Sequence, residues 1–366
     1  MAEKIRVGIV GATVTPGGSG WGANAHVPAL QALSDFELKA VCTAHADTAK
    51  ASAEQFGAAL AFHDMEEMTA HPDVDLIAVV VRVPLHLELV MTALRAGKAV
   101  CCEWPLGADV AQAKEMAAYA KEHSLLTSVG LQARSNPAVM YARDIVANDD
   151  LGDILAVNLS VMVGAVTERG DGRIWQGVRA NGANPMTIPG GHSVDALCFI
   201  LGEFSQISAR VTTRIRNWKH AVTGDDFAVD APDTVSAAGL LRSGAEVAYQ
   251  LASVPHSPSG TRLEIYGRKG TLVLTSTSVN VGPSRLFRAI GSEAMAELTP
   301  PDSYALIPAD MAAGPGRNVG QAYARLAQSM HSGGEYSPDF DLAVTRHQLI
   351  NAMERSSDEG QIVMVD

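Results

Sequence analysis

Residues 1–130 alternate apolar strand patterns with helix patterns, and this alternation constrains the fold more than any other feature of the chain. The strand patterns fall at residues 4–11, 36–43, 75–81, 99–103 and 125–132, and helix patterns lie between them. Parallel strands need crossover helices, so such a rhythm predicts an α/β domain with a doubly wound parallel sheet.

Residues 131–366 have a different rhythm, in which strand patterns follow one another without helices between them. Turn signals at 242–244 and 267–270 indicate hairpins, and helix patterns end the chain at about 318–331 and 340–357. We therefore expect an α+β domain with a large, mostly antiparallel open sheet.

Composition narrows the class of protein. The 366 residues are 47% hydrophobic and carry a net charge of −12, which fits a globular protein and disfavours binding to a nucleic-acid backbone. No apolar run reaches the ~18–20 residues of a membrane helix, and the N-terminus does not resemble a signal peptide. The four cysteines show no metal-binding spacing. We expect a cytoplasmic protein without a metal.

A glycine-rich loop follows the first strand pattern, where a Rossmann domain holds a pyrophosphate. Gly11 takes the first glycine position of the G-x-G-x-x-G fingerprint, but Ala12 and Thr13 follow it. The loop is longer than usual by roughly seven residues, and its other glycines are Gly17, Gly18, Gly20 and Gly22. The alternative is a turn without a ligand, but the strand–loop–helix order favours nucleotide binding.

The second strand pattern ends without the acid that holds the ribose of NAD. The first acid after it is Asp47, which reads as the N-cap of the next helix. A 2′-phosphate is then tolerated, with Thr43, His45 or Lys50 in reach, although His45 also reads as an exposed loop residue. NADP is therefore favoured over NAD.

Residues 75–107 resemble the core signature of the Gfo/Idh/MocA (glucose–fructose oxidoreductase / inositol dehydrogenase) family, which reads strand, T-P-x-x-x-H, helix, A-G-K-H-V, strand, E-K-P. The resemblance continues at residues 129–139, 190–197 and 262–274. It implies a dinucleotide-binding Rossmann domain over residues 1–130. It also implies a substrate-binding and oligomerisation domain over 131–366, whose sheet would form a homodimer or homotetramer.

The resemblance also implies roles for particular residues. His192 is the expected catalytic acid or base, because imidazole titrates near neutral pH. With the glycine-rich loop, the expected cofactor contacts are Gly11, Thr13, Gly20, Trp21, Gly22, Thr43, His45, Pro84, His86, Glu103, Trp104, Pro105 and Gln132. The expected substrate contacts are Trp104, Arg134, Trp175, Ile188, His192 and Asp195.

Two positions depart from the family. Trp104 replaces the lysine of E-K-P, and Ile188 replaces the acid four residues before the histidine. Loss of a charged donor beside a developing alkoxide lowers the rate by orders of magnitude. These changes favour an apolar or aromatic substrate face, and Arg134, Arg173, Trp175 and Lys219 are candidates to replace the lysine.

The long loop, the E-W-P variant and residues 188–192 resemble a branch that includes the fungal repressor of galactose genes. We expect an NAD(P)-dependent oxidoreductase that moves hydride between nicotinamide and a sugar, cyclic polyol, or aromatic-derived alcohol or aldehyde. One alternative is a dinucleotide-responsive regulator or sensor without turnover. Another is a glycoside hydrolase or lyase that retains its cofactor.

Overall fold

The structure is a computed structural model that describes residues 3–14, 20–312, 314–334 and 336–365. The chain forms two compact units. The first comprises residues 1–131, 170–175 and 306–345, and the second comprises residues 132–169, 176–305 and 346–366. The polypeptide therefore returns to the first unit twice after residue 131.

The first unit contains a six-stranded sheet with the order β3-β2-β1-β4-β5-β6, which confirms the predicted doubly wound sheet. All of its paired strands are parallel. The strands are β1 (Ile5–Val10), β2 (Phe36–Cys42), β3 (Leu60–Phe62), β4 (Leu76–Val79), β5 (Ala99–Cys102) and β6 (Thr127–Val129).

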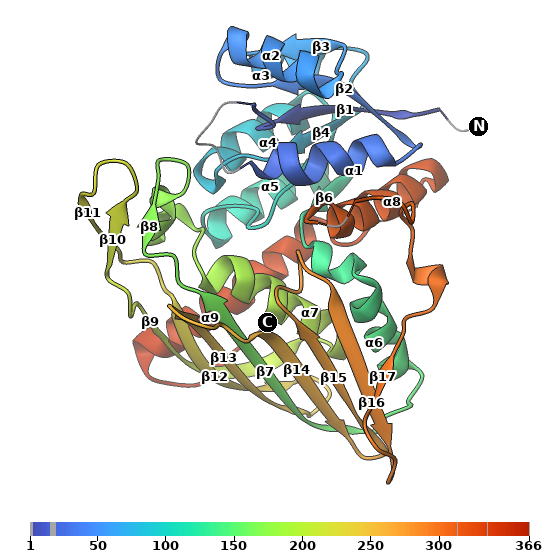
Figure 1. Ribbon diagram of the computed structural model, residues 1–366, viewed down its shortest axis with the longest axis vertical. Helices are drawn as coiled ribbons and strands as arrows, with labels where there is room; N and C mark the ends of the chain where they lie inside the picture. Colours follow the sequence, from blue (N-terminus) through green and yellow to red (C-terminus); the bar gives the residue numbers. More distant parts are fainter. Residues whose placement is uncertain (1–2, 15–19, 313, 335, 366) are drawn as a thin grey trace. The chain divides into compact units, whose positions relative to one another are not determined.

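The first unit contains the crossover helices between its strands and one further helix from near the end of the chain (Figure 1). The helices between the strands are η1 (Gly22–His26), α1 (Val27–Ala32), α2 (Ala46–Phe56), α3 (Met65–Ala70), η2 (Val83–Leu85), α4 (His86–Arg95) and α5 (Val110–Glu122). The late helix, α8 (Gly316–Ser332), packs against α1 and buries Val319, Tyr323 and Leu326 in the same core as β1. The N-cap of α2 is His45, so the predicted cap at Asp47 is wrong; Asp47 lies in the first turn.

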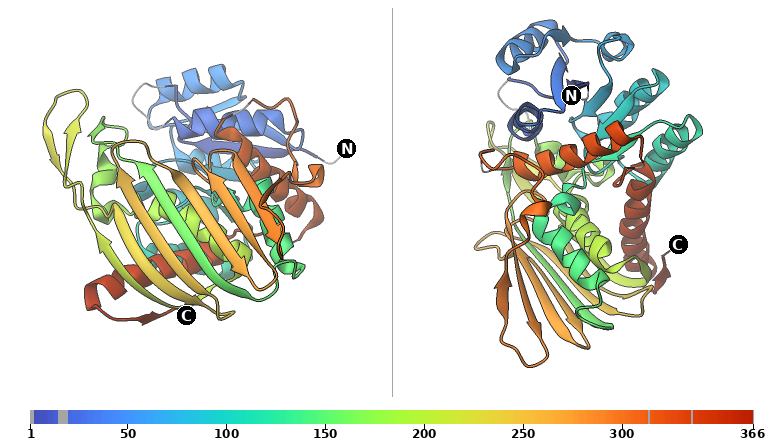
Figure 2. Two further views of the ribbon diagram at one scale, coloured as in Figure 1. Left: turned by 60° about the horizontal axis from the view of Figure 1, so that its bottom comes forward. Right: turned by 90° about the vertical axis from the view of Figure 1, so that its right-hand side faces the viewer.

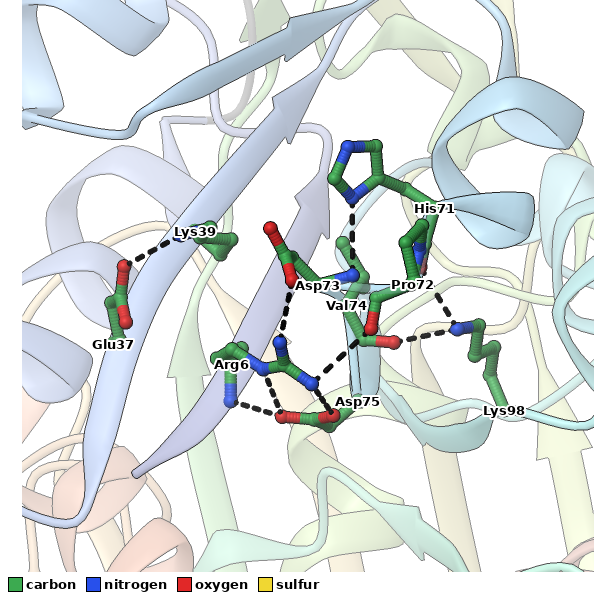
Figure 3. A network of polar contacts seen from close by, with 9 residues as sticks. All are labelled: Arg6, Glu37, Lys39, His71, Pro72, Asp73, Val74, Asp75 and Lys98. Carbon is green, nitrogen blue, oxygen red and sulfur yellow. Dashed lines mark hydrogen bonds and ion pairs between the residues drawn. The ribbon is translucent and has the colours of Figure 1, made fainter. Parts of the chain in front are cut away.

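Ion pairs close the N-terminal edge of the first sheet (Figure 3). Arg6 on β1 donates from Nε and Nη2 to the two carboxylate oxygens of Asp75, at 2.9 and 2.7 Å, and from Nη1 to Asp73 at 2.8 Å. The guanidinium holds the pKa of Asp75 below its usual range. Lys98 Nζ donates to the carbonyl oxygens of His71 and Val74. This edge is therefore structural, and ligand chemistry belongs to the opposite edge.

The second unit contains a nine-stranded sheet with the order β17-β16-β15-β14-β7-β13-β12-β9-β18. Its pairs are antiparallel except β13–β7, which confirms a mostly antiparallel sheet. The strands are β7 (Ile154–Gly164), β9 (Phe204–Thr212), β12 (Thr234–Leu241), β13 (Glu246–Val254), β14 (Gly260–Gly267), β15 (Gly270–Ser276), β16 (Ser284–Ile290), β17 (Ala296–Leu298) and β18 (Val363–Met364). A small separate sheet contains β8 (Glu168–Arg169), β10 (Asn217–His220) and β11 (Asp226–Ala228).

Helices cover one face of the large sheet (Figure 2). Alternate residues of β7, among them Val157, Leu159 and Val161, are buried, as a strand with one covered face requires. The remaining elements are η3 (Gln132–Ser135), α6 (Pro137–Ala147), η4 (Ile174–Gly177), η5 (Arg179–Asn181), η6 (Met186–Gly190), α7 (Gly191–Leu201), η7 (Asp302–Tyr304) and α9 (Phe340–Glu359). Among the described residues, every helix is too short or too polar to span a bilayer.

Candidate functional site

A cavity of about 870 Å³ lies in the first unit at the C-terminal edge of its parallel sheet. Ligands of open α/β sheets bind at this edge, and the volume is within the usual range for a small-molecule site. The lining residues follow β1, β2, β3 and β4 or lie on α2, α3, η2, α4 and one distant segment. They are Val10, Gly11, Thr13, Cys42, Thr43, Ala44, His45, Thr48, His63, Asp64, Met65, Glu66, Val80, Val81, Arg82, Leu85, Glu88, Leu89, Thr92, Asp171 and Gly172.

Gly11 turns the chain sharply at the end of β1. Its φ is +100°, and a Cβ there would lie 2.1 Å from the carbonyl oxygen of Val80, so no other residue fits. A Cβ on Gly22 would lie 2.9 Å from Cα of Ala12, so the start of η1 also packs closely on this turn. The predicted loop glycines Gly17 and Gly18 lie outside the described residues.

The end of β2 presents hydroxyl and imidazole groups to the cavity. Thr43 Oγ1 lies 3.0 Å from the carbonyl oxygen of His45 and 2.7 Å from Thr48 Oγ1. Both hydroxyls are therefore engaged locally, while the His45 side chain is exposed at the start of α2. The sequence predicted Thr43 and His45 here, and the cavity includes both.

Four carboxylates that were not predicted from the sequence line the same cavity. They are Asp64, Glu66, Glu88 and Asp171, and the guanidinium of Arg82 accompanies them. Asp64 Oδ1 caps α3 by accepting from the backbone amides of Glu66 and Glu67. Asp171 lies beyond η3, α6, β7 and β8 in the chain, so no pattern around the second strand could have indicated it.

The His86 side chain is buried in the protein and does not line the cavity. Its ring is fully buried, with Nδ1 3.0 Å from the carbonyl oxygen of Pro105 and Nε2 3.2 Å from that of Val81. Burial lowers the pKa of this imidazole. The side chain thus ties the segment after β4 to the segment after β5, and its predicted contact with the cofactor remains untested.

Glu103 follows β5 and belongs to a buried polar chain. His26 lies between it and Tyr323: Nε2 is 3.0 Å from Glu103 Oε1, and Nδ1 is 2.8 Å from the Tyr323 hydroxyl. Burial raises the pKa of Tyr323. The Glu103 side chain is 13% exposed, and the neighbouring Trp104 is buried. Glu103, Trp104 and Pro105 line no part of the 870 Å³ cavity.

In the second unit, the predicted substrate residues Arg134 and Asp195 pair with each other. Arg134 donates from Nε and Nη2 to the Asp195 carboxylate, at 2.8 Å each, and Arg346 Nε donates to the same carboxylate at 3.1 Å. Arg346 also forms two hydrogen bonds with Glu203. Burial would raise the pKa of Asp195, but the two guanidinium groups outweigh it and lower that pKa. These ion pairs link α7 to η3 and to α9.

His192 lies in the first turn of α7 and is buried, and Ile188 lies four residues earlier in η6. Gly190, the residue before the helix, allows the Tyr249 side chain to pack against the backbone, because a Cβ there would lie 2.8 Å from the Tyr249 hydroxyl. Its lack of a side chain therefore serves protein packing rather than a ligand. Gln132, also predicted from the sequence, is 2% exposed, and both polar atoms of its amide lack a hydrogen-bond partner among the described residues. A buried amide in that state is costly and points to a ligand.

Family models match both halves of the chain. Residues 5–131 match the oxidoreductase family with an NAD-binding Rossmann fold, and residues 137–276 match the C-terminal domain of Gal80p. The fold and the edge at which its cavity opens define a dinucleotide-binding class of protein. Residues 5–131 therefore form the Rossmann domain of a Gfo/Idh/MocA oxidoreductase, and residues 137–276 form a domain like the C-terminal domain of Gal80 proteins.

Similar proteins include enzymes and regulators. The dehydrogenase aclE of Aspergillus oryzae is 29% identical over 99% of this chain and 98% of its own length. The galactose/lactose metabolism regulatory protein GAL80 of Kluyveromyces lactis is 28% identical over 66% of this chain and 56% of its own. The structure of levoglucosan dehydrogenase with NADH and L-sorbose shares the fold, with a TM-score of 0.85 and 21% identity over 100% of both chains.

Proposed function

We propose that this protein is an NAD(P)-dependent dehydrogenase or reductase of a small hydroxyl or carbonyl compound, such as a sugar, a cyclic polyol, or an aromatic-derived alcohol or aldehyde. The observation that carries the proposal is the cavity at the C-terminal edge of a 3-2-1-4-5-6 parallel sheet, in which Gly11 forms the turn after β1. A full-length relative that is named a dehydrogenase supports it.

The residues of the first unit fit a dinucleotide. Gly11 and Thr13 would hold the pyrophosphate with Gly20, Trp21 and Gly22 at the start of η1, where helix amides face an anion. Thr43 and His45 would lie by the adenosine ribose. Gln132 belongs to the second unit, and its unpartnered amide remains the predicted cofactor contact of that unit. When bound, the cofactor supplies the carbon that accepts or donates hydride.

We assign the proton transfer to His192. If an alcohol were oxidised, the hydride of its C–H bond would pass to the oxidised cofactor and the imidazole of His192 would accept the O–H proton. Trp104 replaces a charged donor with a buried apolar ring. The substrate face is therefore expected to be apolar or aromatic, which favours cyclic and aromatic-derived alcohols.

A regulator without turnover is the second candidate. The observation that favours it is the pair of apolar residues, Trp104 and Ile188, at the positions that are charged in the family. The relative GAL80 is named a regulatory protein. Such a protein would bind the same dinucleotide without consuming it.

Two measurements on purified protein test the proposal. Binding of NADH and NADPH is followed by tryptophan emission, and turnover is followed at 340 nm with sugars, cyclic polyols and aromatic diols. We expect His192→Asn to lower kcat by about a hundredfold or more while the Kd for reduced cofactor changes little. His123→Asn, an exposed histidine at the end of α5, is the control.

Each outcome separates the candidates. If the protein bound neither NADH nor NADPH, the whole proposal would be overturned. Tight binding without turnover of any compound would favour the regulator. Full turnover by His192→Asn would remove this histidine from the proton step but leave the dehydrogenase intact.

A further inference from the structure

A buried polar chain joins three parts of the first unit that are far apart in sequence. Its members are Glu103, which follows β5, His26 at the end of η1, and Tyr323 on α8. His26 and Tyr323 are buried, whereas the Glu103 side chain keeps some exposure. The chain of contacts therefore runs from the core of the unit to the C-terminal edge of its sheet, where ligands bind.

The two hydrogen bonds of His26 define the direction of this polar chain. Its Nε2 lies 3.0 Å from Glu103 Oε1, and its Nδ1 lies 2.8 Å from the Tyr323 hydroxyl. A carboxylate only accepts, so a neutral imidazole carries its proton on Nε2 and accepts at Nδ1 from the Tyr323 hydroxyl. Tyr323 thus selects the tautomer of His26 that donates to Glu103.

Aromatic packing also fixes the ring of His26. The rings of His26 and Tyr323 are in T-shaped contact, with their centres 5.6 Å apart, and Tyr323 makes a similar contact with Phe36 at 5.3 Å. The ring of Trp21, just before η1, is T-shaped to His26 at 6.4 Å. These contacts restrict the imidazole to one orientation, so its donation to Glu103 is set before a ligand arrives.

The Glu103 carboxylate also lies close to the main chain after β6. A Cβ on Gly130 would lie 2.5 Å from Glu103 Oε1 and 2.9 Å from its Cδ. The absence of a side chain at Gly130 therefore leaves room for the carboxylate. The other oxygen, Oε2, accepts no hydrogen bond from the described residues. One oxygen is thus held by the protein, and the other is available to a ligand.

Glu103 lies where the second half of a dinucleotide belongs. In a sheet of this strand order, the dinucleotide crosses the point between β1 and β4 at which the order reverses. Its adenosine half lies by β1 and β2, so we expect its nicotinamide half by β4 and β5. Glu103 directly follows β5 and lies outside the 870 Å³ cavity, whose walls follow β1 to β4. The hydroxyls of the nicotinamide ribose are suitable donors to its free oxygen.

We propose that His26 and Tyr323 are positioning residues, which orient the Glu103 carboxylate so that its Oε2 accepts a hydrogen bond from the nicotinamide ribose. This inference rests on the proposed function, which supplies the dinucleotide, and deepens it by naming residues that act on the cofactor only through Glu103. It also gives α8 a part in ligand binding in addition to its part in the core.

The size of the expected effect follows from side-chain freedom. A glutamate without a donor at Oε1 samples several rotamers, and the ligand must then order the side chain on binding. Ordering one such side chain weakens affinity by about two- to tenfold. Glu103→Gln removes the charge-assisted hydrogen bond itself, so it should weaken binding by about tenfold or more.

Calorimetric titration of the full-length protein with NADH, NADPH and ADP tests the proposal. ADP lacks the nicotinamide ribose, so it reports damage to the adenosine and pyrophosphate sites. His26→Asn keeps an amide near the position of Nδ1 and removes the donor at Nε2. It should weaken both reduced cofactors by about three- to tenfold and leave the Kd of ADP within about twofold.

Matched variants identify the hydrogen bonds that matter. His26→Gln places an amide nitrogen near the position of Nε2, so it should recover most of the affinity that His26→Asn loses. Tyr323→Phe keeps the packed ring and removes only the hydroxyl, and it should weaken both reduced cofactors without changing the Kd of ADP. Tyr336→Phe removes the hydroxyl of another buried tyrosine in the same core and should leave all three Kd values within about twofold.

A double-mutant cycle separates positioning from a structural role. If His26 acts through Glu103, adding His26→Asn to Glu103→Gln should weaken the reduced cofactors by less than about twofold further. A structural role would instead give losses that add in the double mutant and that affect ADP and the reduced cofactors alike.

The outcomes distinguish this inference from the proposed function. Wild-type protein that binds neither NADH nor NADPH overturns both. A His26→Asn variant that binds the reduced cofactors as wild type does overturns the positioning role and leaves the dehydrogenase. Equal losses for ADP and the reduced cofactors, or additive losses in the cycle, also overturn the positioning role alone.

Discussion

At the scale of single residues, the second unit depends on a buried set of charges. Arg346 is fully buried and is shared between Asp195 and Glu203, and Arg134 completes the set. Each carboxylate is paired with at least one guanidinium, and this pairing is the reason that the buried charges are tolerated. Removal of one partner leaves an uncompensated charge, which costs more than the pair itself contributes.

We expect Arg346→Met to lower the free energy of unfolding by about 3–5 kcal/mol in urea denaturation at pH 7. Arg355→Met, an exposed position on the same α9 helix, should leave it nearly unchanged. The lowered pKa values of Asp195 and Glu203 add a dependence on pH. Their stabilisation is complete above the unfolded-state values of about 4 and is lost as pH falls through the folded-state values.

In Arg346→Met, the loss on acidification should begin at higher pH than in wild type, because the remaining carboxylates are less well compensated. Equal stability of Arg346→Met and Arg355→Met at pH 7 would show that these buried charges do not hold α7.

At the scale of elements, the turn between β1 and η1 decides whether a ligand can approach the sheet edge. Gly11 and Gly57 both have positive φ, but they differ in their surroundings. A Cβ on Gly11 would clash with the carbonyl group of Val80, the residue after β4, whereas a Cβ on Gly57 would have no atom within 4 Å. Backbone conformation alone therefore accounts for the cost at Gly57, while Gly11 carries a steric cost as well.

Gly11→Ala should consequently abolish saturable NADH binding and destabilise the fold more than Gly57→Ala does. The Gly57 variant should cost about 1–2 kcal/mol, the usual penalty for this backbone region, and should bind NADH as wild type does. Fluorescence titration and thermal unfolding of both variants provide the comparison. If Gly11→Ala binds NADH normally, the turn after β1 does not shape the nucleotide site.

The order of elements could be predicted because hydrophobic periodicity and turn residues are features of short stretches of sequence. Most strands of the two sheets, both hairpins and helices α8 and α9 follow the sequence patterns, whereas β3, β16, β17 and β18 were not predicted. The partners of individual side chains were less accessible. The family resemblance implied substrate contacts for Arg134 and Asp195, but nothing in the sequence indicates that these two residues, 61 positions apart, form an ion pair. Asp171 enters the cavity through long-range contacts, which no local pattern encodes.

At the scale of the whole molecule, the first unit is not a contiguous stretch of chain. Residues 306–345 belong to it, and α8 buries Val319, Tyr323 and Leu326 among residues of β1, α1 and β2. Without α8 these apolar surfaces would face water, at a cost of about 25 cal/mol per Å² exposed.

A fragment of residues 1–131 should therefore lack a cooperative thermal transition and should bind the hydrophobic dye ANS. A fragment in which residues 306–345 are joined to it by a flexible glycine–serine linker should regain a cooperative transition. Cooperative unfolding of residues 1–131 alone, with the near-ultraviolet circular dichroism of a packed core, would show that α8 is dispensable for this unit.

The late return of α8 has a consequence during synthesis on the ribosome. The nucleotide-binding sheet leaves the exit tunnel first, but the helix that completes its core is made only after most of the second unit. At about 5–20 residues per second, the wait lasts roughly 10–40 s. Throughout that interval the nascent sheet exposes apolar surface to chaperones and to other nascent chains. A premature stop codon after residue 305 would consequently damage the domain that was translated first.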